Sequence, residues 1–159
     1  MALTREQMDQ KLDEHFGFEM SDNVEGVLAT LSDDVVHDIV GMPSGPTYGP
    51  AAARGFYEAL FSDLSDGQVV SRRRLYGDNF MVDDSLWSGR APGRPFGIEG
   101  RNRPLSFRLL HVLEFKDDGV ISRENVWVDL ATIQQQLPLS EEQRRKLGKM
   151  QRVFVPLPR

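Results

Sequence analysis

The second half of the chain alternates short apolar runs with turn residues, and this pattern restricts the fold more than any other feature. Four segments have the alternation that a strand requires: residues 68–76, 80–87, 105–115 and 120–128. Gly77-Asp78 separates the first two segments, and Asp117-Asp118-Gly119 separates the last two, as in hairpins. The pattern therefore predicts an antiparallel meander of four strands.

The first half of the chain has helical periods instead. A capping-box pattern at residues 4–7 precedes apolar residues at helical spacing. We expect helices at about residues 5–18, 24–31 and 51–64, the last one closed by residues 65–67, and one strand at 35–40. Helices first and strands afterwards predict an α+β fold, in which a curved, mostly antiparallel sheet packs on the N-terminal helices.

Composition excludes several classes of function. A length of 159 residues fits one domain, and a net charge of −5 gives no attraction for nucleic acid or anionic lipid. The basic run at residues 72–74 alternates faces along a strand, so it predicts a solvated edge. Cysteine is absent, which excludes disulfides and thiolate metal sites. Neither a membrane-spanning run nor a signal peptide is recognisable, so we expect a cytoplasmic protein.

Turn glycines, strand aromatics and an aspartate-glycine hairpin recur along the chain in a definite order. They are Gly77-Asp78, Gly89, Phe96-Gly97, Gly100-Arg101, Phe107-Arg108, Phe115, Asp117-Asp118-Gly119-Val120-Ile121, Glu124, Trp127, Asp129 and Gln135-Gln136-Leu137. Together they resemble the SnoaL-like polyketide cyclases of the nuclear-transport-factor-2-like superfamily. The resemblance implies a cone-shaped fold around one pocket, with residues 1–137 as a single domain. Residues 138–159 would form a C-terminal helix and a proline-containing tail packed on it.

The resemblance also implies a range of activities. Relatives of this type include polyketide cyclases, ketosteroid isomerase, limonene epoxide hydrolase, scytalone dehydratase and non-enzymatic binding proteins, so the fold alone does not fix the reaction. We expect a cofactor-independent acid/base enzyme for a small hydrophobic carbonyl substrate, acting as an aldol-type cyclase, isomerase or dehydratase. Two alternatives stay open: a non-catalytic domain that binds a small molecule or a partner, and an epoxide or lactone hydrolase that uses Arg108 with Asp129.

Three residues are candidates for catalysis. His111 alternates with apolar residues on its strand and so points inward, where burial keeps an imidazole neutral and able to accept a proton. His37 precedes Asp38 on the first strand, and we favour His37 as the inward residue of this pair. Asp129 follows the last strand and fits a helix N-cap. The resemblance implies a second role for Asp129, that of the general acid/base of the cyclases.

Six further residues are candidates for ligand contacts: Tyr48, Tyr57, Tyr76, Trp87, Asn125 and Trp127. The aromatic members equally fit a purely structural core. The three histidines are scattered and lack paired ligand spacing, so we expect no metal site. Phosphate-binding and dinucleotide-binding motifs are also absent from the sequence, and no cofactor is expected.

The outer faces of two strands predict self-association. Alternation assigns two outward sets: Ser106, Arg108, Leu110, Val112 and Glu114 on one strand, and Val120, Ser122, Glu124, Val126 and Val128 on the last. Each set combines an apolar centre with polar residues, as interfaces do. We therefore expect a homodimer that pairs these faces.

Overall fold

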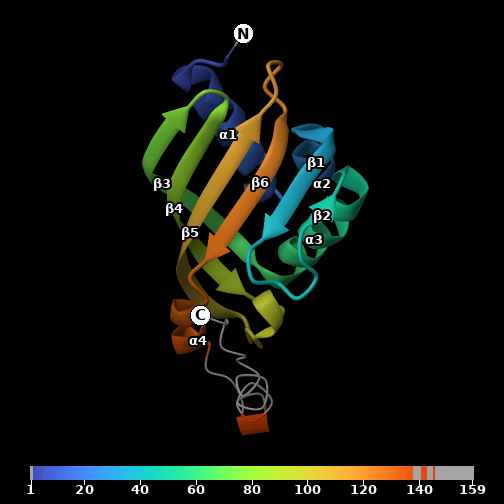
Figure 1. Cartoon of the computed structure of the whole chain (residues 1–159). Helices are drawn as coiled ribbons and strands as arrows, with labels where there is room; N and C mark the ends of the chain where they lie inside the picture. The colour runs from blue at the N-terminus through green and yellow to red at the C-terminus, as the bar shows by residue number, and fades with distance from the viewer. Residues whose placement is uncertain (1, 138–140, 143–144, 146–159) are drawn as a thin grey trace, which may run out of the picture.

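The computed structural model describes residues 2–137, 141–142 and 145. Within them the elements follow in this order: α1 (Arg5–Met20), α2 (Val24–Ala29), β1 (Leu31–Ile39), β2 (Thr47–Tyr48), α3 (Pro50–Asp63), β3 (Ser65–Gly77), β4 (Phe80–Ala91), a 3-10 turn η1 (Pro95–Gly97), β5 (Arg103–Phe115), β6 (Ile121–Val128) and α4 (Leu130–Gln136) (Figure 1). The C-terminal helix and tail expected at 138–159 lie outside the described residues, except for residues 141–142 and 145.

All six strands belong to one curved sheet, in the order β2-β1-β6-β5-β4-β3. β3 to β6 form the antiparallel meander that the turn signals predicted. β1 pairs in parallel with β6, so the first strand of the chain lies beside the last. The sheet curls around α1, α2 and α3, which cover its concave face (Figure 1). The α+β class and the curved sheet are both confirmed.

α1 begins where the capping box predicted. The Thr4 hydroxyl accepts a hydrogen bond from the Gln7 backbone N–H, and the Gln7 side chain accepts one from the Thr4 backbone N–H. Its buried side chains are spaced as one helical face: Met8, Leu12, His15 and Phe16. This face packs against the sheet, so the histidine is carried into the interior with its apolar neighbours.

α3 ends at Asp63, within one residue of the predicted end, but the helix-closing turn predicted at residues 65–67 is wrong. Leu64 already has an extended backbone, and Ser65 pairs with Arg90 as the first residue of β3. Asp66 has a positive φ of 52° within a register irregularity between Ser65 and Gln68. Residues 65–67 therefore form a bulge that starts the strand, although their composition is that of a helix-ending turn.

The faces of β6 are the reverse of the predicted ones. Glu114 pairs with Arg123 and Phe115 with Ile121, so Ser122 is an extra residue without a cross-strand partner. One extra residue exchanges the faces of all the residues that follow it. From position 124 onward the even-numbered side chains of β6 therefore point to the concave side of the sheet, where alternation had placed the odd-numbered ones.

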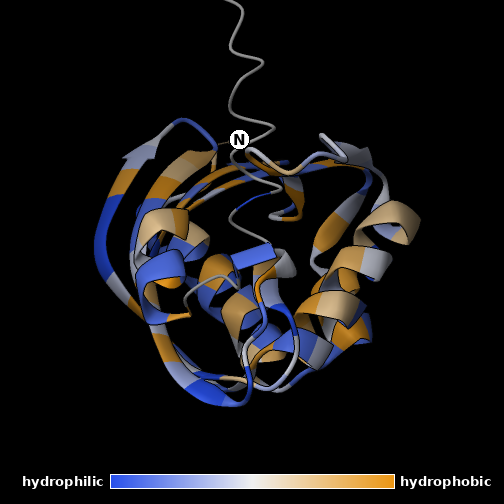
Figure 2. Cartoon of the chain, turned by 90° about the horizontal axis from the view of Figure 1, so that it is seen from below, coloured by the Kyte–Doolittle hydropathy of each residue, from blue (hydrophilic) through white to orange (hydrophobic). Residues whose placement is uncertain are grey.

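Two groups of buried apolar residues fill the interior. One joins α1, α2 and α3 to the sheet around Leu12, Tyr57 and Met81. The other surrounds Trp87 and Phe107 near α4. Figure 2 shows sheet and helices enclosing this interior. Among the described residues, no helix has the length and apolar character of a membrane span.

Candidate active site

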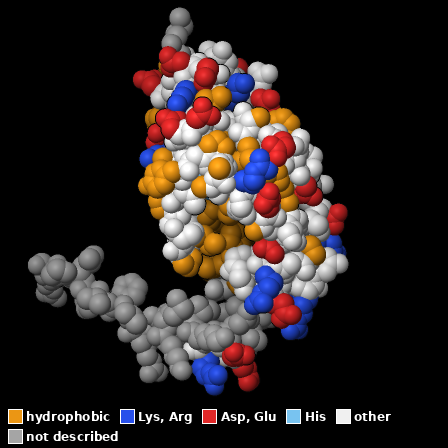
Figure 3. Space-filling model, turned by 90° about the vertical axis from the view of Figure 1, so that its right-hand side faces the viewer, with side chains coloured by type: hydrophobic (Ala, Val, Ile, Leu, Met, Phe, Trp, Pro, Cys, Tyr) orange, Lys and Arg blue, Asp and Glu red, His pale blue; other side chains and the backbone are white. Residues whose placement is uncertain are grey.

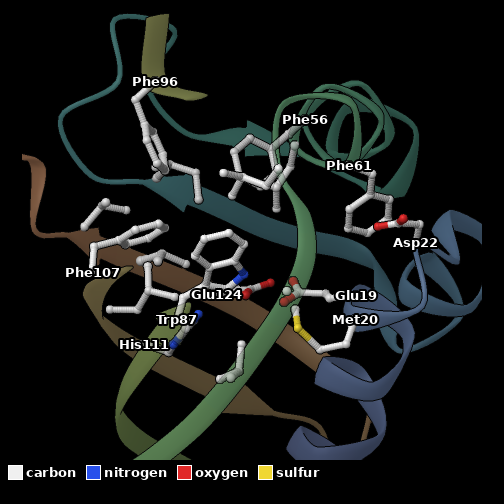
Figure 4. A pocket seen from close by; sticks show the side chains of 18 of the residues that line it. Glu19, Met20, Asp22, Phe56, Phe61, Trp87, Phe96, Phe107, His111 and Glu124 are labelled. Carbon is white, nitrogen blue, oxygen red and sulfur yellow. The ribbon is translucent and has the colours of Figure 1, made fainter. Parts of the chain in front are cut away.

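A cavity lies between the helices and the concave face of the sheet. Most of its lining side chains are apolar, and five are aromatic: Phe56, Phe61, Trp87, Phe96 and Phe107 (Figure 4). The space-filling view from the α3 side shows a hollow lined with hydrophobic side chains (Figure 3). Concave, mostly apolar walls with a few polar groups are typical of sites for small molecules.

Glu124, which β6 directs inward, is the centre of a group of buried polar side chains at the cavity. The Oε2 atom of Glu124 accepts a hydrogen bond of 2.9 Å from the Tyr57 hydroxyl. The Nε2 atoms of His15 and His37 lie 3.6 Å and 3.9 Å from the same oxygen. Burial would raise the pKa of Glu124, but the neighbouring histidines, His15 foremost, hold this pKa well below its usual range. Glu124 is thus a buried anion at neutral pH.

His15 supplies the balancing positive charge. The Thr30 hydroxyl donates to the carbonyl of Val27, so it accepts a hydrogen bond of 2.6 Å from Nδ1–H of His15. The Nε2 atom of His15 lies 3.3 Å from Glu19 Oε1 and 3.6 Å from Glu124. Burial lowers the pKa of His15, but the two carboxylates, Glu124 foremost, outweigh this effect and raise the pKa to about 10. His15 is therefore an imidazolium at neutral pH.

His111 faces the cavity from β5 in the opposite protonation state. It is 4% exposed and packs against Phe16, with 5.1 Å between ring centroids. Burial lowers the pKa of His111, so its imidazole is neutral at neutral pH. Its Nδ1 atom has no hydrogen-bond partner among the described residues: Asp83 Oδ2 is 3.9 Å away and accepts from the Ser85 hydroxyl. His111 thus lines the cavity with one of its ring nitrogens unpaired.

Four of the predicted residues meet at this cavity. His37, Trp87 and His111 line it, and Tyr57 lies behind Glu124, to which it is hydrogen-bonded. His37 is 3% exposed, and its Nε2 atom, like Nδ1 of His111, has no hydrogen-bond partner in the described part of the chain. Unpaired buried polar atoms are costly, so each one calls for an explanation, and a ligand or a water molecule in the cavity is one explanation for these two.

Two of the predicted tyrosines lie elsewhere. Tyr48 is on the edge strand β2 and is 70% exposed. Tyr76 is on β3, where its hydroxyl donates to Asp9 of α1. Neither lines the cavity. Tyr76 instead joins β3 to α1. The aromatic composition of these segments did not indicate which tyrosines would face the cavity.

The bulge at Ser122 removes the other three predicted residues from the cavity. Asn125 donates a hydrogen bond to Asp38 on the outer face, and Trp127 is 42% exposed there. Asp129 is the N-cap of α4, with its carboxylate accepting from the Thr132 backbone N–H at 3.1 Å and from the Thr132 hydroxyl at 2.6 Å. Its carboxylate does not line the cavity, and these hydrogen bonds account for the lowered pKa of Asp129.

Arg108 also lies outside the cavity. Its guanidinium forms an ion pair with Asp84 on the convex face of the sheet. No arginine is among the described residues that line the cavity. The arginine flanked by two carboxylates that a hydrolase of this fold would need is therefore not assembled by Arg108 and Asp129.

One group of side chains has the composition of a metal site. His15 Nε2 and one carboxylate oxygen each from Glu19 and Glu124 lie within 4.8 Å of one another. The hydrogen bond from Nδ1–H to Thr30 would leave Nε2 free to bind a cation. A cation would first have to displace the proton that the two carboxylates hold on His15.

Sequence reasoning did not identify His15, Glu19 or Glu124 as residues of the site. One signal was available: His15 and Glu19 are four residues apart on α1, so they share a side of the helix. Glu124 could not be found from alternation, because the bulge reversed its side of the strand.

The fold and the site define a class: an α+β cone of the nuclear-transport-factor-2-like type with an internal, histidine-bearing cavity. A model of the SnoaL-like polyketide cyclases matches residues 7–137. The chain belongs to this family.

Solved structures agree with this assignment. TsrD of Streptomyces laurentii has a TM-score of 0.74 at 18% identity, covering 87% of this chain and 99% of TsrD. A Jannaschia sp. CCS1 protein assigned to the SnoaL-like polyketide cyclases has a TM-score of 0.74 at 13% identity, covering 86% and 96%. An M. tuberculosis LEH-like epoxide hydrolase has a TM-score of 0.64 at 15% identity, covering 91% and 94%. No curated protein matches the chain. At these identities the likeness establishes the fold, and the chemistry has to be argued from the site.

Proposed function

We propose that the chain is a cofactor-independent acid/base enzyme for a small hydrophobic carbonyl compound, acting as an aldol-type cyclase, isomerase or dehydratase. One observation carries the proposal: two buried histidines, each with an unpaired ring nitrogen, line an apolar cavity, and a buried carboxylate lies beside one of them. Such reactions begin when a base removes a proton from carbon next to a carbonyl group. No part of this chemistry requires a redox group.

His111 is the base in this proposal. Its neutral imidazole can accept a proton at neutral pH, since burial lowers its pKa. His37 donates a proton to the carbonyl oxygen and is assisted by Glu124, 3.9 Å from its Nε2 atom. A fixed carboxylate stabilises positive charge on a neighbouring imidazole and orients the ring. Glu124, rather than Asp129, thus supplies the carboxylate of the site.

Proton exchange tests this proposal without knowledge of the natural substrate. In D2O, a base in the cavity should accelerate loss of the α-proton signals of 2-tetralone, an apolar ketone, in 1H NMR spectra. His111→Gln and His37→Gln should each lower the protein-catalysed rate by a factor of about 100 or more. Asp129→Asn is the matched control: its side chain is outside the cavity, and Asn also caps helices, so both rate and melting temperature should be retained.

Two results would count against the proposal. Full exchange in His111→Gln and His37→Gln would refute the assigned roles. Binding of 2-tetralone without any exchange would favour the alternative of a domain that holds a small molecule and performs no chemistry on it.

A homodimer remains part of the proposal. Leu110 and Trp127 are cross-strand partners on the convex face of the sheet and are 38% and 42% exposed. Val70 and Leu75 of β3 add exposed apolar surface at 58% and 47%. An apolar face of this kind supports pairing with a second copy. Light scattering should then report twice the 18.0 kDa chain mass, and a monomer at micromolar concentration would contradict it.

A further inference from the structure

The ionisable side chains that line the cavity are mainly acidic. Its lining includes four carboxylates, those of Glu19, Asp22, Asp66 and Glu124, and no lysine or arginine among the described residues. The imidazolium of His15, just behind the wall, is the cation that compensates them. Since one cation faces four carboxylates, the cavity has a negative potential, which low-dielectric walls strengthen.

The carboxylates become more exposed toward the solvent side. Glu124 is 2% exposed at its side chain and Glu19 is 11% exposed, whereas Asp22 and Asp66 are exposed residues. The carboxylate of Asp22 has neither a hydrogen bond nor an ion pair within the described part of the chain. Among the residues that the structure describes, the carboxylate of Asp66 accepts only from Ser65, at 3.4 Å. Two anionic groups are thus available to a molecule that enters.

An aromatic ring, that of Phe61, lies on the same side of the cavity as Glu19 and Asp22. Figure 4 shows Glu19, Met20, Asp22 and Phe61 on one side of the cavity, with Phe96 and Phe107 on the other. The faces of aromatic rings attract cations, and most strongly where water is excluded. Carboxylates and an aromatic ring on one side, with Phe96 and Phe107 on the other, suit a molecule with one cationic end and one apolar end.

The unpaired ring nitrogens provide an independent sign that the cavity is built for a ligand. Nε2 of His37 and Nδ1 of His111 are both fully buried atoms of cavity-lining residues, and neither has a hydrogen-bond partner in the described part of the chain. A polar group on the bound molecule would satisfy them. The residues that line the cavity therefore carry two unpaired ring nitrogens in addition to the carboxylates.

We infer that the ligand of this cavity is an apolar molecule that carries a protonated amine, with the ammonium group near Glu19, Asp22 and Asp66. The inference rests on the proposed function and narrows its substrate class to amine-bearing hydrophobic compounds. The ammonium lies toward the solvent side, and the apolar body extends to Phe96 and Phe107. Carboxylated analogues are excluded by repulsion from the same side chains.

Three probes with one naphthalene body and different polar ends test the inference by isothermal titration calorimetry. They are 2-(2-naphthyl)ethylamine, 2-(2-naphthyl)ethanol and 2-naphthylacetate. We expect the amine to bind about tenfold tighter than the alcohol, and the carboxylate to bind more weakly than both. Raising the salt concentration to 0.5 M should reduce the preference for the amine, because the attraction is partly screened.

Two substitutions test which carboxylates cause the preference for the amine. Asp22→Asn and Asp66→Asn should each lower the affinity for the amine several-fold and leave that for the alcohol unchanged. Asparagine accepts the positive φ of both positions, 53° and 52°, so the backbone is preserved. Asp78→Asn, at the exposed β3–β4 turn, makes the same change of charge away from the cavity and should alter neither affinity.

The outcomes separate this inference from the proposed function. Equal affinity for amine and alcohol, or tighter binding of the carboxylate, would overturn the inference and leave the apolar pocket intact. If none of the three probes binds, both the inference and the small-molecule pocket of the proposed function fail.

Discussion

Glu124→Gln should destabilise the fold, in a way that depends on pH. The substitution removes the carboxylate 3.6 Å from Nε2 of His15 and keeps the size of the side chain. In the folded wild type the pKa of His15 is about 10, against 6.5 for an unperturbed histidine. About three pKa units separate pH 7 from this value, and each unit corresponds to about 1.4 kcal/mol, so the raised pKa contributes roughly 4 kcal/mol at pH 7.

The variant loses only part of this contribution, since Glu19 remains 3.3 Å from His15. We expect a decrease of about 2–4 kcal/mol in the free energy of unfolding, comparable with other losses of one partner from a buried ion pair. Urea unfolding at pH 7 measures it, as a decrease of about 1–2 M in the midpoint. Glu114→Gln is the control: its partner Arg123 is 40% exposed, so the change should be below about 1 kcal/mol.

The pH dependence follows from the direction of the shift. The pKa of His15 is higher in the folded state than in the unfolded state, so protonation of His15 favours folding. This stabilisation is complete below pH 6.5 and is lost as the pH rises toward 10. Wild type should therefore lose several kcal/mol between pH 7 and 10, and Glu124→Gln should lose distinctly less. Equal stabilities at pH 7 with parallel pH profiles would refute the charged pair of His15 and Glu124.

Three further results are expected. As pH falls, the rate of α-proton exchange should reach half its maximum below pH 6.5, the pKa of an unperturbed histidine, because burial lowers the pKa of His111; a half-maximum above pH 6.5 would contradict this. Asp129→Ala should reduce stability by about 1 kcal/mol in thermal unfolding while exchange continues, since the side chain caps α4 and does not line the cavity. EDTA should leave the exchange rate unchanged, because the proton on His15 already occupies the site between Glu19 and Glu124; loss of activity that Zn²⁺ restores would instead indicate a bound cation.

The sequence indicated the architecture because its signals are local. The capping box at Thr4 and the turn at Gly77-Asp78 depend on residues a few positions apart, and both proved to start or join elements as expected. Alternation along β5 also placed His111 correctly, since no irregularity interrupts the strand before this position. Such features are encoded by backbone preferences and by the period of apolar residues.

The parallel pairing of β1 with β6 was not predictable from local pattern. It joins His37 to Glu124 across 87 residues of sequence, and this contact arises only when the sheet has closed. The inward placement of His37 and the position of Glu124 beside it therefore depend on strand order, which the apolar period of either strand does not encode.

The carboxylate of the site was decided by tertiary structure alone. One extra residue, Ser122, moves Glu124 to the concave face and Asp129 to the outside, where it caps α4. Alternation is exact within a strand, but a bulge changes its phase, and whether one forms depends on how the hairpin packs against the sheet. The charges of the side chains at the cavity also depend on the tertiary structure. His15 and Glu124 acquire opposite charges because folding buries them 3.6 Å apart, whereas an isolated histidine would be mostly neutral at pH 7.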